Sequence, residues 1–249
     1  MAIIIKSREE REKMREAGHI VAEVLAALRS AVRPGITTAD LDAIAVRELK
    51  QRGAKASFLG YHGYPASVCT SVNDEIVHGI PSKRVLNDGD IISIDFGAIY
   101  HGWHGDSAIT VPVGEVTSEV KRLLKVTEDS LYRGIAAARA GNRVSDIGRA
   151  VQSFVEAAGF SVVRQYGGHG VGRSMHEDPQ VLNYIEKGQP NPVLRPGMVI
   201  AIEPMVTMGQ EETQVLLDKW TVVTADKSYA AHFEHTVAIT QGDADILTR

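Results

Sequence analysis

The segment IISIDFGAIYHGWHGDSAITVPV, Ile91–Val113, reads as two apolar strands joined by a glycine-containing turn. Each strand carries one aspartate, since Asp95 ends the first apolar run and Asp106 opens the second. If the turn centres near Tyr100 and His101, the two aspartates fall roughly opposite each other. Like charges at facing positions repel, and their unpaired burial is costly. A cation between them would remove both problems, so the question is whether the chain supplies further metal ligands.

The composition is that of an ordinary globular protein, with 249 residues, 44% hydrophobic and 23% charged. A net charge of −4 without a basic block argues against a nucleic-acid surface. The single cysteine, Cys69, excludes an internal disulfide and fits a reducing compartment. The apolar run Ile3–Ile5 is too short for a signal peptide, and no segment reaches the roughly 20 apolar residues of a membrane span. We therefore expect a cytoplasmic protein with no nucleic-acid or membrane partner.

Helices and strands are expected on both sides of this hairpin. Ser7 and Glu10 resemble a capping box at the start of a helix over Ser7–Val32. Thr38 is expected to cap a second helix over Ala39–Arg52. In chain order, the later elements expected are helices Ser118–Arg139 and Val144–Ala158, strands Ser161–Arg164 and Met198–Glu203, a long hairpin near Met208–Lys227, and a strand over Tyr229–Thr240.

The chain also contains an internal repeat. Glycines and aspartates recur at the same offsets 106 residues apart, namely Gly35, Asp40 and Gly53 against Gly141, Asp146 and Gly159. A second match, displaced by 108 residues, makes Asp95 equivalent to Glu203. Asp106 then corresponds to Glu234, if the second hairpin is about 20 residues longer. A common glycine-turn-strand pattern is the alternative explanation, but chance carboxylates have no reason to follow a repeat.

Two helices followed by strands, occurring twice, predict an α+β fold with a pseudo-twofold repeat and sheets that face a shared cleft. The halves would span about residues 1–113 and 114–249. The candidate metal ligands are Asp95, Asp106, His169, Glu203 and Glu234. This set suits Mn²⁺, Fe²⁺, Co²⁺ or Zn²⁺, and four carboxylates nearly neutralise two ions, as in known two-metal hydrolytic sites. Taken singly, each residue is more simply a turn, cap or structural residue, so the prediction depends on the joint pattern.

Other catalytic motifs do not fit. The glycine-rich loop Gly168–Gly172 lacks the Lys-Ser/Thr pair of a P-loop. The segment His176–Gln180 ends in glutamine and contains proline, so it is not an H-E-x-x-H helix. No G-x-S-x-G elbow occurs, and Cys69 reads as a pocket or core residue rather than a nucleophile.

With the ligand order Asp-Asp-His-Glu-Glu, three motifs resemble the type I methionine aminopeptidases of the bacterial kind. These motifs are HGIP (His78–Pro81), GGHGVGRSMHEDP (Gly167–Pro179) and AIEPM (Ala201–Met205). The resemblance covers essentially the whole chain. It implies the pita-bread fold, with curved antiparallel sheets flanked by helices, as a single catalytic domain over residues 1–249.

The resemblance also implies the activity, which is removal of the N-terminal methionine from nascent proteins and peptides with a small second residue. The water would be activated by two divalent metal ions, which could be Co, Mn, Fe or Zn. Asp106 and Glu234 resemble the carboxylates that bridge both ions, and Asp95 resembles the chelator of one. His169 and Glu203 resemble the ligands of the other.

The same resemblance gives three residues catalytic roles: His78, His176 and Glu203. His78 and His176 would also contact the substrate. The positions matching the methionine side-chain pocket are Tyr61, His62, Tyr64, Cys69 and Trp220. This chain departs from the usual pattern at Phe58 and Met175, which changes the shape expected for the pocket but not the reaction.

Nascent chains and N-terminal Met peptides are the expected partners, with a transient ribosome contact, and we expect a monomer. Two alternatives remain on the same fold. One is an exopeptidase like prolidase or aminopeptidase P, which cleavage before proline would reveal. The other is a non-catalytic peptide-binding module, which the intact ligand set disfavours. The same ligands disfavour an amidinohydrolase of the creatinase type.

Overall fold

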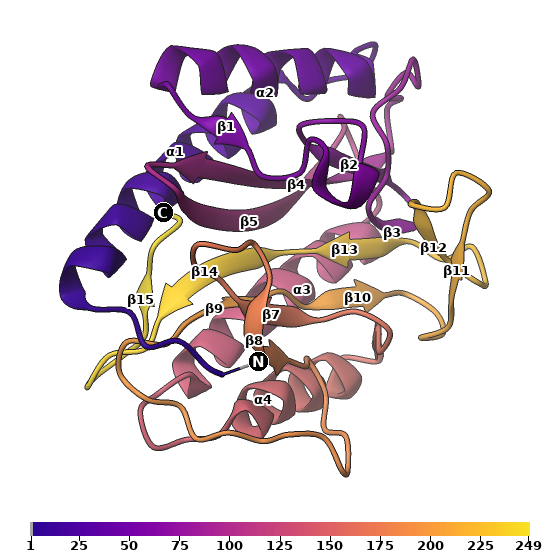
Figure 1. The fold of residues 1–249 in the computed structure, drawn as a ribbon. Helices are drawn as coiled ribbons and strands as arrows, with labels where there is room; N and C mark the ends of the chain where they lie inside the picture. The colour runs from indigo at the N-terminus through magenta and orange to yellow at the C-terminus, as the bar shows by residue number, and fades with distance from the viewer. Residues whose placement is uncertain (1) are drawn as a thin grey trace.

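The segment Ile91–Val113 forms two long paired strands in the computed structural model, which describes residues 2–249. The strands are β4 (Ile91–Tyr100) and β5 (Trp103–Pro112) (Figure 1). Between them lies a two-residue turn, His101–Gly102, with φ values of 49° and 78°. Positive φ at both central residues is the geometry that matches the twist of a tight hairpin.

The register of this hairpin differs from the prediction. Asp95 faces Ala108 and Asp106 faces Gly97, so the two aspartates are diagonal neighbours rather than direct partners. The reason is that the turn centres between His101 and Gly102, one residue later than expected. Diagonal residues still project from the same face of the sheet, and both carboxylates therefore remain on one surface.

Around β4 and β5 the chain builds a large antiparallel sheet. Its order is β1 (Lys55–Ala56), β4, β5, β14 (Glu234–Ala238), β9 (Val199–Ile202), β7 (Gly168–Gly170) and β8 (Glu177–Val181), with β2 (Cys69–Val72) paired to β4 and β15 (Asp245–Ile246) paired to β14. Two small sheets flank it: β13 (Ala230–His232), β10 (Met205–Thr207) and β6 (Ser161–Val162), and β11 (Thr213–Val215), β12 (Val222–Thr224) and β3 (Glu75–Val77). The strand expected over Tyr229–Thr240 is therefore two strands, because the chain leaves the ladder at Phe233.

The predicted helices are α1 (Arg8–Ala31), α2 (Thr38–Arg52), α3 (Ser118–Ala137) and α4 (Val144–Ala157). The capping box of Ser7 and Glu10 is present, but α2 is capped by Thr37, not Thr38. Thr37 has Asp40 three residues on, and the two side chains and backbones bond reciprocally. Thr38 has Leu41 at that spacing, and leucine cannot complete a capping box.

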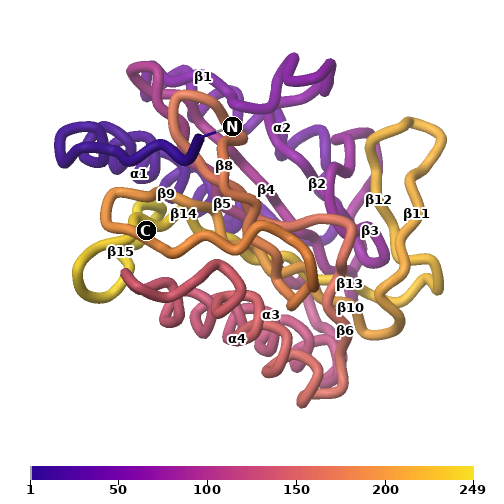
Figure 2. Tube along the Cα trace, turned by 60° about the horizontal axis from the view of Figure 1, so that its bottom comes forward, coloured from indigo at the N-terminus to yellow at the C-terminus, as the bar shows by residue number. Residues whose placement is uncertain are grey.

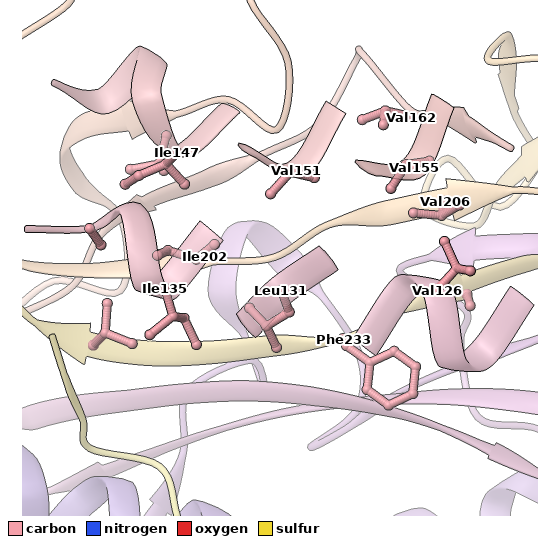
Figure 3. Packing of buried hydrophobic residues seen from close by; sticks show 14 of the residues in the cluster. Val126, Leu131, Ile135, Ile147, Val151, Val155, Val162, Ile202, Val206 and Phe233 are labelled. Atoms are coloured by element: carbon pink, nitrogen blue, oxygen red, sulfur yellow. The ribbon is translucent and has the colours of Figure 1, made fainter. Parts of the chain in front are cut away.

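Each pair of helices covers its own half of the strands. One buried cluster joins α1 and α2 to β2, β4 and β5, and a second joins α3 and α4 to β9, β10 and β14. Figure 3 shows Leu131 and Val151, from the two helices of the second cluster, in the same cluster as the strand residues Ile202 and Val206. Figures 1 and 2 both show α3 and α4 on the opposite side of the strands from α2.

The repeat predicted from the sequence is confirmed in backbone detail. The Gly35 N–H donates to Leu86 O at 2.8 Å, and the Gly141 N–H donates to Leu194 O at 3.0 Å. Isolated bridges join Thr37 to Val85 and Arg143 to Val193. The φ angles of Gly35 and Gly141 are 90° and 92°. Both halves therefore use the same turn before the second helix and the same bridge to the following strand. None of the helices within residues 2–249 combines the length and the apolar character that a membrane span requires.

Candidate metal centre

The predicted ligands come from strands that meet in the middle of the main sheet. Asp95 lies within β4 and Asp106 within β5, while Glu234 opens β14 and Glu203 directly follows β9. His169 is the central residue of β7. The strand order β4, β5, β14, β9, β7 thus places the five polar side chains on, or directly after, five consecutive strands. All five strands consist largely of buried residues.

Their ligand atoms are close enough to share cations. One ligand atom each of Asp106, His169 and Glu234 lies within 4.8 Å of the others. His169 Nε2 is 3.7 Å from Asp106 Oδ2 and 3.7 Å from Glu203 Oε1. Asp95 Oδ1 is buried, and the charges of Asp106 and Glu203 raise the pKa of the Asp95 carboxyl. The four carboxylates predicted from the repeat therefore form one cage together with His169.

Burial disfavours the ionised form of each carboxyl group in the cage. Burial, followed by the charge of Asp106, raises the pKa of Glu203 to about 8. The pKa of Asp106 is raised to about 7, again by burial. Burial and the neighbouring carboxylates hold the pKa values of Asp95 and Glu234 well above their usual range. These groups stay ionised at neutral pH only if positive charge compensates them.

The cage has the chemistry of a divalent-metal site. Within residues 2–249, Asp95 Oδ1, Asp106 Oδ1 and Glu234 Oε1 are buried without a hydrogen-bond partner. Unpaired buried oxygens are costly, and cations would satisfy all three. Burial lowers the pKa of His169 to about 3, so the imidazole is neutral, as metal ligation requires. Oxygen and imidazole donors without thiolate fit catalytic divalent ions.

The cage forms the floor of a cavity of about 550 Å³. Every residue predicted for the site lines this cavity: Phe58, Tyr61, His62, Tyr64, Cys69, His78, Asp95, Asp106, His169, Met175, His176, Glu203, Trp220 and Glu234. Residues from distant parts of the sequence thus converge where the resemblance places them, although their individual roles remain predictions.

One wall of the cavity is apolar. Phe58, Tyr64, Cys69 and Met175 belong to a buried cluster with Ala66. The rings of Tyr64 and Trp220 pack edge to face at 5.1 Å. The Tyr64 hydroxyl donates to the Gly79 carbonyl at 2.9 Å. The wall therefore presents ring edges, a thiol and a thioether to the cavity, which suits an unbranched apolar side chain.

Two histidines lie near the cage on loops. His176 Nδ1 is 2.8 Å from the Tyr61 hydroxyl, and its ring lies 4.0 Å from that of His169. His78 has a backbone φ of 60° and packs edge to face against Tyr166. Burial lowers the pKa of both His78, to about 4, and His176. Both imidazoles are therefore neutral near pH 7 and able to donate one hydrogen bond and accept another.

A buried ion pair supports the His176 loop from behind. Lys6 Nζ lies 2.6 Å from Glu177 Oε2, with side chains 1% and 9% exposed. The other Glu177 oxygen accepts the Ser174 N–H at 3.3 Å. Lys6 of the N-terminal segment thus fixes the Glu177 carboxylate, which in turn bonds to the backbone of Ser174 at the start of the Ser174–Glu177 turn.

Several neighbours of the site were not predicted from the sequence. Tyr166 and Gln180 line the cavity, and nothing in their local sequence marks them. His232 is 1% exposed, and its Nε2 lies 3.7 Å from Glu203 and 3.9 Å from Glu234. A signal for His232 was available, because it shares one face of the last strand with Glu234.

Comparisons with known proteins identify the family of the chain. The family model described as metallopeptidase family M24 matches residues 12–241. The chain is 55% identical over 249 residues to methionine aminopeptidase 1 of Bacillus subtilis, covering 99% of each chain.

Solved structures show the same fold. A methionine aminopeptidase from Rickettsia prowazekii superimposes with a TM-score of 0.97 at 40% identity, covering 100% of both chains. A prolidase from Pyrococcus furiosus has a TM-score of 0.77 at 24% identity, with 99% of this chain and 65% of that chain covered. The similarity to the prolidase shows a shared fold only.

Proposed function

The chain belongs to metallopeptidase family M24, and we propose that it hydrolyses the first peptide bond of chains that begin with methionine. It is a methionine aminopeptidase by its full-length similarity to proteins of that name. The observation that carries the proposal is the cage of buried carboxylates with unpaired oxygens beside an apolar wall. The cage would serve the chemistry, and the wall would select the side chain.

The apolar wall fits the methionine side chain. Ring edges from Tyr64 and Trp220, with the Phe58 ring, give the thioether sulfur aromatic neighbours, which are favourable contacts. Met175 and Cys69 add soft, adaptable surface. We propose that the small second residue follows from the crowding of His78 and His176 around the next position of the substrate.

The cage would hold two divalent ions, of which Mn²⁺, Fe²⁺, Co²⁺ and Zn²⁺ all suit the donor set. Asp106 and Glu234 would contact both ions, Asp95 one, and His169 with Glu203 the other. Bound ions of this kind lower the pKa of a water so that it attacks at neutral pH, and they polarise the carbonyl that it attacks.

The remaining steps belong to residues of the chain. If the Tyr61 hydroxyl donates to Nδ1 of His176, the proton of the neutral ring lies on Nε2, where it can stabilise the negative charge on the carbonyl oxygen. His78 would contact the nitrogen of the scissile bond. Glu203 would carry a proton from the attacking water to the leaving amine.

We further propose that residues 1–249 work as one catalytic domain on nascent chains, in the cytoplasm, as a monomer with a transient ribosome contact. These proposals follow from the resemblance and from the nature of the substrate, which emerges from the ribosome.

Three peptides test the function. Metal-free and metal-loaded protein are incubated with Met-Ala-Ser, Met-Lys-Ser and Ala-Pro-Ser, and the released amino acid is measured. We expect cleavage of Met-Ala-Ser alone, and only with metal. Equal cleavage of the two methionine peptides, or activity that survives chelation, would refute the proposal, whereas preference for Ala-Pro-Ser would indicate a prolidase-like enzyme.

A further inference from the structure

His232 is a buried imidazole with no role in the function proposed above. It ends β13, it is 1% exposed, and it is not part of the cavity wall. In the part of the chain that the structure describes, neither of its ring nitrogens has a hydrogen-bond partner. An unpaired buried polar atom costs free energy. A hydrogen-bond partner for one of the two ring nitrogens of His232 would reduce this cost.

The nearest partners are carboxylates of the cage. His232 Nε2 lies 3.7 Å from Glu203 Oε2 and 3.9 Å from Glu234 Oε2. The other oxygen of Glu203 lies 3.7 Å from His169 Nε2. The Glu203 carboxylate is thus placed between two imidazoles, one facing each oxygen. A distance of 3.7 Å exceeds a hydrogen bond by only about half an ångström, which a small rotation of the glutamate side chain removes.

The backbone of His232 is fixed from both sides. Its N–H donates to Thr110 Oγ1 at 2.9 Å, and the same hydroxyl donates to its carbonyl at 2.7 Å. His232 also pairs with Met205 in the β10–β13 ladder. The ring therefore starts from a rigid base, whereas Glu203 lies at the end of a strand and is the partner able to move.

We propose that His232 is a positioning residue that donates a hydrogen bond from Nε2 to Oε2 of Glu203 and so holds Oε1 of Glu203 toward the metal site. The inference rests on the proposed function, since it assumes that Glu203 is a ligand. Partners of this outer kind orient metal ligands, and their loss costs about 10–100-fold in metal affinity or activity.

The test compares His232→Leu, which removes the donor, with His232→Gln, whose amide N–H can replace it. Binding of Co²⁺ is measured by calorimetry, with the visible absorption of the bound ion, and kcat and KM are measured on Met-Ala-Ser. His235→Gln is the control, since His235 lies three residues along and contacts Thr248 Oγ1 at 2.9 Å. Metal binding and cleavage by the unsubstituted chain test the proposed function separately from these differences.

We expect His232→Leu to weaken the affinity for the more loosely held ion by about 10–100-fold and to lower kcat with little change in KM. His232→Gln should restore both, with an unchanged absorption spectrum, and the control should match the native chain. Native affinity in the leucine variant overturns the proposal. So does an altered cobalt spectrum in the glutamine variant, which would make His232 a direct ligand. If circular dichroism shows the leucine variant unfolded, the glutamine variant decides alone: native affinity and spectrum support the proposal, and a tenfold loss refutes it.

Discussion

The two halves of the molecule carry equivalent carboxylates on strands of different continuity. In the first half, Asp95 and Asp106 lie inside β4 and β5, which run unbroken to a two-residue turn. In the second half, Glu203 lies between β9 and β10, and Glu234 follows the break at Phe233. The longer glutamate side chains therefore project from strand ends, where the shorter aspartates project from a continuous ladder.

The connection between the strands differs as well. A two-residue turn joins β4 to β5, whereas the second half inserts the β11–β12 hairpin, which projects at the edge of the molecule in Figures 1 and 2. This hairpin carries Trp220 to the cavity. The side chain of Glu203 is 12% exposed and that of Asp106 is 4% exposed. The first half thus provides two ligands on a continuous ladder and most of the apolar wall, and the second half adds Met175 and Trp220 to that wall.

The largest effect on activity is expected when the carboxylate charge is removed at either of the equivalent positions, Asp95 or Glu203. Glu203→Gln should lower kcat by about 10²–10⁴-fold even in excess metal, because the proposed proton carrier is lost together with the proposed ligand. Asp95→Asn should recover most of its activity as the metal concentration is raised, since the role proposed for Asp95 is metal ligation alone. The measurement is kcat on Met-Ala-Ser across a Mn²⁺ titration, and equal recovery of the two variants would show that the halves do not differ in this way.

A second prediction concerns the ion pair between the N-terminal segment and the second half. Lys6→Met leaves the Glu177 carboxylate buried without its partner and should cost about 3–5 kcal/mol of unfolding free energy. Lys13→Met is the matched control, because its pair with Glu9 is exposed and should change stability by less than about 1 kcal/mol. Urea unfolding measures both, and similar losses would show that burial of the first pair does not matter.

The repeat and the ligand cage could be predicted from the sequence, whereas the register of the strands and their breaks could not, for physical reasons. The glycines at equivalent offsets and the carboxylates on apolar strands revealed the repeat and the cage, because both are set by local backbone and burial requirements. The register of Asp95 against Asp106 was not predictable from the sequence. A shift of one residue in the centre of the turn changes the residue that faces Asp106 by two positions, from Asp95 to Gly97. The break between β13 and β14 at Phe233 and the lack of hydrogen-bond partners for the His232 ring both depend on contacts with distant strands. The local sequence does not encode such contacts.

The third prediction is a dependence on pH. Burial raises the pKa of Asp106 to about 7 and that of Glu203 to about 8. A carboxyl whose folded pKa is raised stabilises the fold below its unfolded pKa of about 4, and this contribution is lost as pH rises through the folded value. The melting temperature of metal-free protein should therefore fall between about pH 5 and pH 8.5. Mn²⁺ should reduce the fall, and parallel curves with and without metal would contradict the assignment of the cage.

The smallest effect tests the repeat itself. Gly35 and Gly141 have φ values of 90° and 92°, and an added Cβ would meet nothing within 4 Å at either position. Gly35→Ala and Gly141→Ala should therefore each cost about 1–2 kcal/mol from backbone strain alone. Urea unfolding of both variants should give equal losses, and a difference of more than about 1 kcal/mol would mean that the two turns are not equivalent.

The most direct test of the account is the metal stoichiometry of Asp106→Ala and Asp95→Ala after equilibrium dialysis with Mn²⁺, measured by elemental analysis. The native chain should retain two ions, as the four carboxylates predict. Asp106→Ala should lose both, because we propose that Asp106 contacts both ions, and Asp95→Ala should lose one. Identical losses from the two variants would contradict the division of roles, and a native chain without stoichiometric metal would contradict the site itself.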